Sequence, residues 1–294
     1  MTTVPVAALL AAALVACSSD GGAGAPGPTT TRNAAATTAV APPTKSSPAA
    51  TSGPTPAPGP TTVRATAAAE RTLPPGSALP GDADCAARVV AAPEIRPGNV
   101  AHNQRRGRQK GLPGAYYGRV TGDFTGTTDE ILQWTACKWG IDADVVRAQA
   151  AKESYWTMDR LGDFAKDSKV CLPRHGLGVD GKPGECPEST GMLQVRYQYA
   201  GLPAGLDTWP EVAESTAYHA DFTYAYWRSC YDGTLDWLNT TDRVGTYAAG
   251  DLWGCVGIWF AGRWHTDPAE QYIAAVKGYV ATRIWTTRSF IDYR

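Results

Sequence analysis

The segment QAAKESYW, residues 149–156, places a glutamate near the end of a predicted helix in the folded part of the chain. On such a helix, Val146, Gln149 and Ala150 lie three to seven residues before Glu153 and share its face. That face is largely apolar, which favours a buried carboxyl group with a raised pKa, and the negative end of the helix dipole acts in the same direction. The alternative interpretation is an ordinary surface glutamate.

The chain on both sides of this segment carries the capping signals of helices. Thr127 or Thr128 can cap a helix that runs to Trp139 and ends at Gly140, and Asp142 can cap the helix that carries Glu153. Three further helices are expected over residues 210–231, 251–259 and 267–285. The folded part is therefore predicted to be mainly α-helical.

The stretch from Leu161 to Ser189 differs from its surroundings because it is rich in Gly, Pro and Asp. Its composition predicts a long loop or a small hairpin that cysteines hold together. A long structured loop inside a compact domain often serves function.

A second motif, STGMLQV, follows directly at residues 189–195. The Glu153-Ser154 pair at a helix end, followed by a small-residue turn into GMLQV, resembles the soluble lytic transglycosylase and goose-type lysozyme group. The resemblance covers about residues 127–285 and implies a lysozyme-like helical domain with a disulfide-tied loop insertion. It also implies that Glu153 is the catalytic acid and base. Residues 254–264 match the third motif of that group only in part, since its Asn is missing.

The same resemblance suggests which residues line the sugar-binding cleft. These residues are Ser189, Gly191, Met192 and Gln194. Because sugar rings present apolar C–H faces that pack on aromatic rings, Trp259 and Trp264 are added as cleft candidates, although most tryptophans are expected in the core. Asp163, in the segment LGDFAKD, is a candidate helper carboxylate, and a structural turn is the alternative interpretation.

These residues suit the cleavage of the β-1,4 bonds of peptidoglycan glycan strands. In lytic transglycosylation one glutamate protonates the leaving oxygen and then acts as base while the C6 hydroxyl attacks C1. A muramidase would need a second carboxylate to activate water. Two other hypotheses stay open: a hydrolase of another polysaccharide, and a non-catalytic lipoprotein that binds the cell wall.

The N-terminal part has the composition of an export signal and a tether. Residues 4–16 are an apolar run too short for the roughly 20 residues that span a bilayer, and LVAC at 14–17 resembles a lipobox with Cys17 as the acylated residue. The start MTTVPV carries no Lys or Arg, unlike most export signals. We expect a signal peptide over 1–17, a disordered Pro/Ala/Thr-rich linker over 18–81 and the catalytic domain over 82–294. The protein is then exported and held by lipid at the outer face of the membrane, or otherwise secreted.

Six cysteines remain when Cys17 is set aside, and an even number in an exported chain predicts disulfides. Many pairings are possible. We favour Cys171–Cys186, Cys230–Cys255 and Cys85–Cys137.

The charge balance and the motifs exclude several other classes of function. With 27 basic and 28 acidic residues, the chain lacks the basic excess of a nucleic-acid binder. The basic cluster at 105–110 is interpreted as a solvated loop or a patch that faces an anionic wall polymer. The four histidines show no metal-ligand spacing, and no phosphate loop or nucleophile elbow occurs. We therefore expect no metal and no cofactor.

Overall fold

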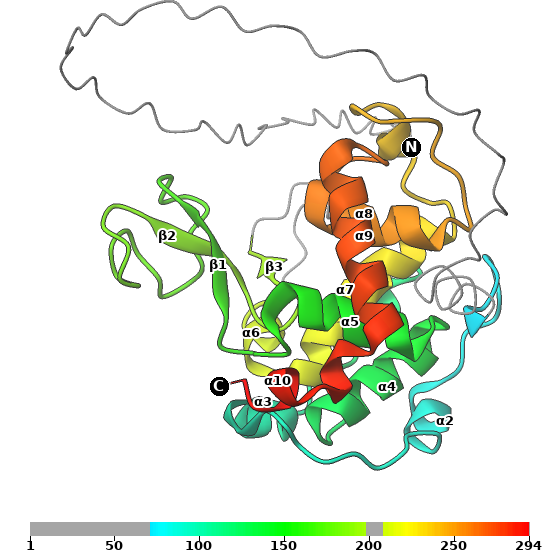
Figure 1. Cartoon of the computed structure of the whole chain (residues 1–294), viewed down its shortest axis with the longest axis horizontal. Helices are drawn as coiled ribbons and strands as arrows, with labels where there is room; N and C mark the ends of the chain where they lie inside the picture. The colour runs from blue at the N-terminus through cyan, green and yellow to red at the C-terminus, as the bar shows by residue number, and fades with distance from the viewer. Residues whose placement is uncertain (1–70, 198–207, 294) are drawn as a thin grey trace, which may run out of the picture. The chain divides into compact units, whose positions relative to one another are not determined.

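The computed structural model describes residues 71–197 and 208–293, and the predicted export signal, Cys17 and most of the predicted linker lie outside the described residues. The described part is mainly helical (Figure 1). Its α-helices are α2 (Asp82–Ala86), α3 (Val100–Asn103), α4 (Thr128–Trp139), α5 (Ala143–Ser154), α6 (Glu211–Glu214), α7 (Thr216–Tyr231), α8 (Leu252–Ala261), α9 (Asp267–Thr282) and α10 (Arg288–Ile291). Short 3-10 turns are η1 (Pro97–Asn99), η2 (Tyr117–Arg119), η3 (Asp236–Asn239) and η4 (Ile284–Thr286). No helix among these residues is both long enough and apolar enough to cross a bilayer.

Helix α7 forms the centre of the core, because every one of its residues is buried. It packs against α4, α6 and α8, and it passes behind α5 and α9 in Figure 1. Several of its buried polar side chains have internal hydrogen-bond partners. The Asp221 carboxylate, for example, accepts hydrogen bonds from the Lys138 ammonium group at 2.8 Å and the Trp139 indole N–H at 2.8 Å. Polar atoms can therefore lie in this core without a large desolvation penalty.

Helices α4 and α5 begin where their capping residues predict. Thr127 and Glu130 form a capping box at the start of α4, and Gly140 ends that helix in the left-handed conformation. The Asp142 side chain caps α5 by accepting from the Asp144 N–H. Helix α5 ends at Ser154 rather than at Trp156, because Tyr155 has a φ of 55° and turns the chain away.

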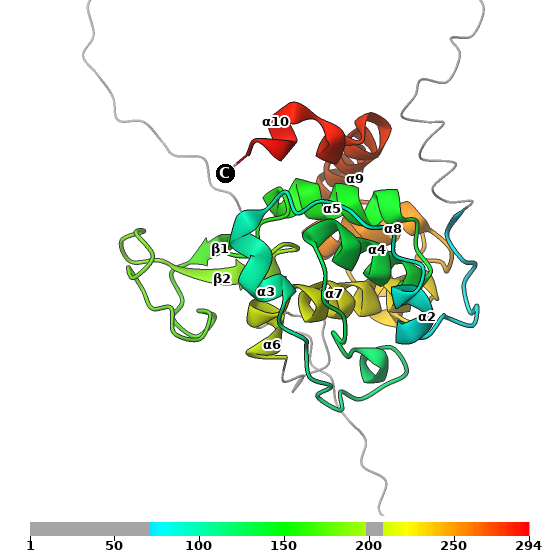
Figure 2. The same ribbon diagram turned by 90° about the horizontal axis from the view of Figure 1, so that it is seen from below.

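The segment between α5 and α6 forms a disulfide-tied hairpin. Strands β1 (Leu161–Ala165) and β2 (Cys186–Thr190) pair antiparallel, and β3 (Val195–Arg196) pairs antiparallel with β2. Cys171–Cys186 closes the long connection between β1 and β2. The hairpin reaches away from the helices in both views (Figures 1 and 2). The other two predicted disulfides, Cys85–Cys137 and Cys230–Cys255, are also confirmed.

Two of the expected helices are interrupted. The helix expected over 210–231 is broken at Ser215, whose extended backbone ends α6 and whose hydroxyl accepts from the Tyr218 N–H to cap α7. The same hydroxyl donates to the Arg105 carbonyl at 2.7 Å, so a contact distant in sequence stabilises the break. The helix expected to reach Trp285 ends at Thr282, because Arg283 adopts the left-handed conformation.

Residues 71–81, which their composition assigns to the linker, belong to the folded part. The Leu73 N–H donates to the Gly140 carbonyl at 2.8 Å, and the buried Arg228 guanidinium donates to the Leu73 and Pro74 carbonyls. The folded part therefore begins at or before Arg71 rather than at residue 82. Composition does not reveal this, because the contacts depend on distant partners such as Gly140, Asp142 and Arg228.

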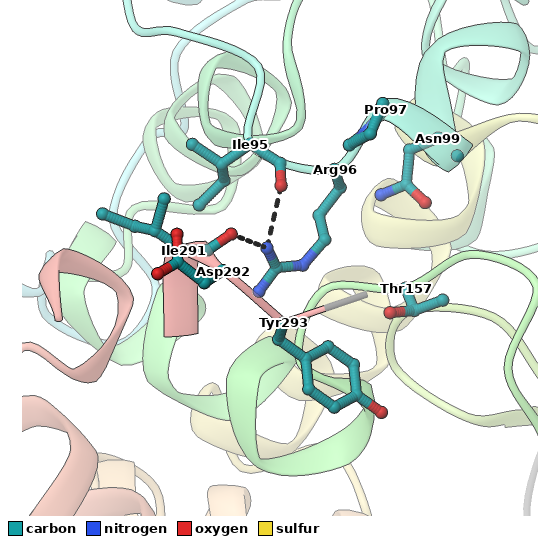
Figure 3. Close-up of a pocket in the computed structure, with 9 residues that line it drawn as sticks. Ile95, Arg96, Pro97, Asn99, Thr157, Ile291, Asp292 and Tyr293 are labelled. Atoms are coloured by element: carbon teal, nitrogen blue, oxygen red, sulfur yellow. Dashed lines mark hydrogen bonds between the residues drawn. The ribbon is translucent and has the colours of Figure 1, made fainter. Parts of the chain in front are cut away.

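One buried cation joins the N-terminal segment to the end of the described chain. The guanidinium of Arg96, which is 4% exposed, donates to the backbone carbonyls of Tyr155 and Phe290 at 2.6 Å each. It also donates to the carbonyls of Ile95 and Ile291 (Figure 3). Arg96 lies at the edge of a pocket of about 530 Å³ that the α10 segment closes on one side.

We predict that Arg96→Met destabilises the domain by about 2–4 kcal/mol, because buried carbonyls lose their donors and the α10 segment loses its attachment. Urea unfolding followed by circular dichroism measures the change. Arg288→Met is the control, since the Arg288 side chain is 94% exposed and forms an exposed ion pair with Asp292. An equal effect of both variants would contradict this role of Arg96.

Candidate active site

Glu153 lies in the last turn of α5, where that helix meets the turn that follows β2. The neighbouring Ser154 hydroxyl donates to the Met192 carbonyl at 2.8 Å, which joins the two predicted motifs directly. The Glu153 side chain is half-buried, and its Oε1 accepts a hydrogen bond from the Tyr272 hydroxyl of α9. Helices α5 and α9 pack side by side along this contact. The carboxyl group is thus held between two helices rather than extended into solvent.

A second buried tyrosine completes the surroundings of the carboxyl group. Gln149, one turn before Glu153, accepts from the Tyr224 hydroxyl of α7 at 3.0 Å. Burial and the Glu153 charge raise the pKa of Tyr224 and of Tyr272 well above the usual value. Both phenols therefore stay protonated and act as donors.

The environment of Glu153 favours the protonated carboxyl. Burial is the largest cause and raises the pKa of Glu153 to about 7. The Tyr272 hydrogen bond and the Lys152 charge lower that pKa, whereas the Asp163 charge raises it. Near neutral pH the group can therefore exist in both protonation states, as a general acid and base requires.

Asp163 lies on β1, close enough for its charge to affect Glu153, but it is not a free carboxylate. Its Oδ2 accepts from the Arg196 Nε of β3 at 3.1 Å, and Arg196 also lies 3.6 Å from a Glu188 carboxylate oxygen. Asp163 has a φ of 48°, which is unusual for a residue within a strand, and it lies in β1 rather than in the turn considered for it. It is a neighbour of Glu153 with a charge that Arg196 partly compensates.

The GMLQ turn is held against α7 by a buried histidine. The Leu193 N–H donates to His219 Nε2 at 2.9 Å, and His219 Nδ1 donates to the Val212 carbonyl at 2.7 Å. Burial lowers the pKa of His219 to about 4, so the ring is neutral and can accept at Nε2. Gly191 has a φ of 81°, and a Cβ there would lie 2.4 Å from the His219 ring. Only glycine fits this position.

The Gln194 side chain stabilises the same turn through hydrogen bonds. Its Nε2 donates to the Gly191 carbonyl at 2.8 Å and the Arg160 carbonyl at 3.1 Å, and its Oε1 accepts from the Ser189 hydroxyl at 3.1 Å. Ser189 and Met192 are fully buried. The four predicted cleft residues of this motif therefore lie in one turn that is attached to α5 at Ser154, the residue after Glu153, and the Gln194 and Ser189 side chains bond within that turn and to the Arg160 carbonyl.

The two predicted cleft tryptophans have different environments. Trp259 is half-buried and donates its indole N–H to the Leu193 carbonyl at 2.9 Å, so it joins α8 to the GMLQ turn. Trp264 is 2% exposed and packs on the α8 backbone, where a Cβ at Gly254 would lie 2.4 Å from its ring. A ring this buried presents no face to a sugar, so the interpretation of Trp264 as a cleft residue is wrong.

Sequence patterns did not single out Tyr272, His219 or Phe260, which all contribute to this region. Tyr272 fits the apolar face of α9, and nothing local marks its hydroxyl as a partner of Glu153. His219 has no metal-ligand spacing, and its role depends on a turn 26 residues earlier in the chain. Phe260 directly follows a candidate, but its exposure depends on where α8 ends.

Neither described pocket is lined by Glu153. The pocket at Arg96 lies between the η1 turn and the end of α10 (Figure 3), and another of about 280 Å³ lies between the hairpin and α6. The candidate site is therefore defined by the contacts around Glu153. Within the described ranges, no group of three or more His, Cys, Asp or Glu side chains could hold a metal ion.

No protein-family model, no curated protein and no solved structure matches this chain.

We predict that Glu153→Gln stabilises the fold at pH 8 by up to about 3 kcal/mol and has little effect at pH 4. Because the folded-state pKa is raised, the wild-type carboxyl is bound in its favoured neutral form at low pH, and stability falls as pH rises from about 4.5 to about 7. The glutamine stays neutral throughout and can still accept from Tyr272. Thermal unfolding across this pH range measures the difference, and parallel curves for the two proteins would contradict a buried carboxyl.

Proposed function

We propose that the domain cleaves the β-1,4 glycosidic bonds of peptidoglycan glycan strands by lytic transglycosylation, with Glu153 as the general acid and then the base. One observation carries the proposal: a carboxyl group with a pKa near 7 is held by a buried tyrosine beside the GMLQ turn. In this proposal the helical domain is of the lysozyme-like class.

The proposed reaction has two proton transfers. Protonated Glu153 gives its proton to the glycosidic oxygen as the C1–O bond breaks through an oxocarbenium-like transition state. The resulting carboxylate then takes the proton of the muramic acid C6 hydroxyl while that oxygen bonds to C1. The products are a 1,6-anhydro sugar and a free hydroxyl on the leaving strand, and Glu153 is protonated again.

The contacts of Glu153 suit both steps. Tyr272 donates to Oε1 and so orients the carboxyl group for proton transfer. The Asp163 charge disfavours ionisation of Glu153, and this effect supports the acid form that starts the reaction.

The location proposed for this activity is the outer face of the cytoplasmic membrane. The three disulfides suit an oxidising compartment outside the cytoplasm. In the proposal, lipid on Cys17 anchors the chain and the linker lets the domain reach the glycan.

We predict that Glu153→Gln lowers cleavage of purified sacculi by about 10³-fold or more, because no proton is left to donate. Mass analysis of wild-type products should show fragments one water lighter than hydrolysis products. Asp292→Asn, which removes an exposed carboxylate directly after α10, serves as the control and should leave the rate unchanged. Full activity of the Glu153 variant would contradict the proposal. A wild-type chain that binds sacculi without cutting them would indicate a wall-binding lipoprotein.

A muramidase reaction is the second candidate, because Asp163 is the carboxylate near Glu153. We predict that Asp163→Asn keeps transglycosylation products but moves the alkaline limb of the pH–rate profile to lower pH, since a charge that raises the Glu153 pKa is lost. Rates of product release by the variant and the wild type across pH 5–9 test this. A loss above about 100-fold, together with products that carry an added water, would favour the muramidase instead.

A further inference from the structure

Phe260, in the last turn of α8, is an exposed aromatic residue that lies close to the candidate site. Its side chain is 60% exposed, although most of α8 is buried. A single exposed aromatic side chain is ordinary on a protein surface and by itself indicates nothing. Phe260 is of interest because of its position relative to Glu153.

The Phe260 ring stacks on the ring of Tyr272. The two centroids lie 5.1 Å apart and the planes differ by 2°. Because Tyr272 donates its hydroxyl to Glu153, only one side chain separates the Phe260 ring from the candidate acid. One face of the phenyl ring is covered by this stacking, so its exposed surface is mainly the opposite face and the edge.

Two neighbouring contacts hold this arrangement in place. The preceding residue, Trp259, donates to the Leu193 carbonyl and ties the end of α8 to the GMLQ turn. Helix α8 also packs along α9, which carries Tyr272. Phe260 therefore sits at a fixed place beside the acid rather than on a free loop.

The Tyr272 ring on which Phe260 stacks also lies near a polar group. The exposed Lys152 ammonium lies 6.0 Å from the Tyr272 ring centroid. A flat apolar face in a region that also carries a hydrogen-bond donor suits a pyranose ring, whose C–H face is apolar and whose hydroxyl and amide groups need polar partners. An alkyl chain would pack on the Phe260 ring but would form no hydrogen bond with the Lys152 ammonium group.

We propose that Phe260 is the stacking platform of a saccharide subsite next to Glu153, and that it binds an N-acetylated pyranose of a β-1,4 glycan. This inference rests on the proposed function for the identity of the glycan. Binding and cleavage are separate measurements, however, so the two proposals can fail separately.

The test is saccharide binding by full-length protein that carries Glu153→Gln, which prevents cleavage. Calorimetric titration with the tetramer of β-1,4-linked N-acetylglucosamine gives the dissociation constant. Adding Phe260→Ala should weaken binding by roughly tenfold or more, because the apolar area covered by the sugar is lost. Adding Phe260→Trp, which keeps an aromatic plane, should retain affinity within about threefold.

Tyr293→Ala is the matched control. Tyr293 is also an exposed aromatic side chain, 40% exposed, and its ring lies on Tyr155 at a centroid distance of 4.8 Å. Adding this change should leave the dissociation constant unchanged, and thermal unfolding of each variant verifies the fold.

Three outcomes would overturn the inference: no binding of the tetramer by the Glu153→Gln protein, equal binding after Phe260→Ala, or equal weakening by Tyr293→Ala. Phe260-dependent binding in a protein whose wild type leaves sacculi intact would support the subsite and overturn the proposed cleavage. Cleavage of sacculi that does not depend on Phe260 would support the proposed cleavage and overturn the subsite.

Discussion

The hydrogen bond from the Tyr272 hydroxyl to the Glu153 carboxyl is the contact on which the candidate site depends. It joins α5 to α9, two helices separated by more than a hundred residues, at the point where the half-buried Glu153 side chain lies between them. Burial raises the pKa of Glu153, while the tyrosine donor limits that rise. The two opposing effects leave the group able to gain and lose a proton near neutral pH.

The rest of the domain holds the partners of this contact in place. The GMLQ turn is attached to α5 through the Ser154 hydroxyl, to α7 through His219 and to α8 through Trp259. All three bonds reach the backbone of residues 192–193, so the turn is positioned by its main chain. This attachment of the turn requires a glycine at 191 and a neutral histidine at 219. Both requirements follow from the close packing of the turn against α7.

The way in which the domain is stabilised agrees with the proposed export of the chain. Its disulfides join α2 to α4, α7 to α8, and the β1–β2 connection to the start of β2. Buried charges add further links, such as Lys138 with Asp221 in the core and Arg96 with the carbonyls near α10. The hairpin is held mainly by its own strands and its own disulfide, which separates this insertion from the helical core that carries Glu153.

The sequence alone determined the helical class, the starts of α4 and α5, and a loop or hairpin tied by cysteines after α5. These features follow from local signals: caps, apolar periodicity, turn residues and an even cysteine count. The place of Glu153 next to the GMLQ motif was implied by the resemblance. Only the tertiary structure decided that Tyr272 binds Glu153, that Trp264 is buried while Phe260 is exposed, and that residues 71–81 join the fold. Each of these depends on which distant segment covers a side chain or accepts a backbone hydrogen bond, and helical spacing does not specify the covering partner.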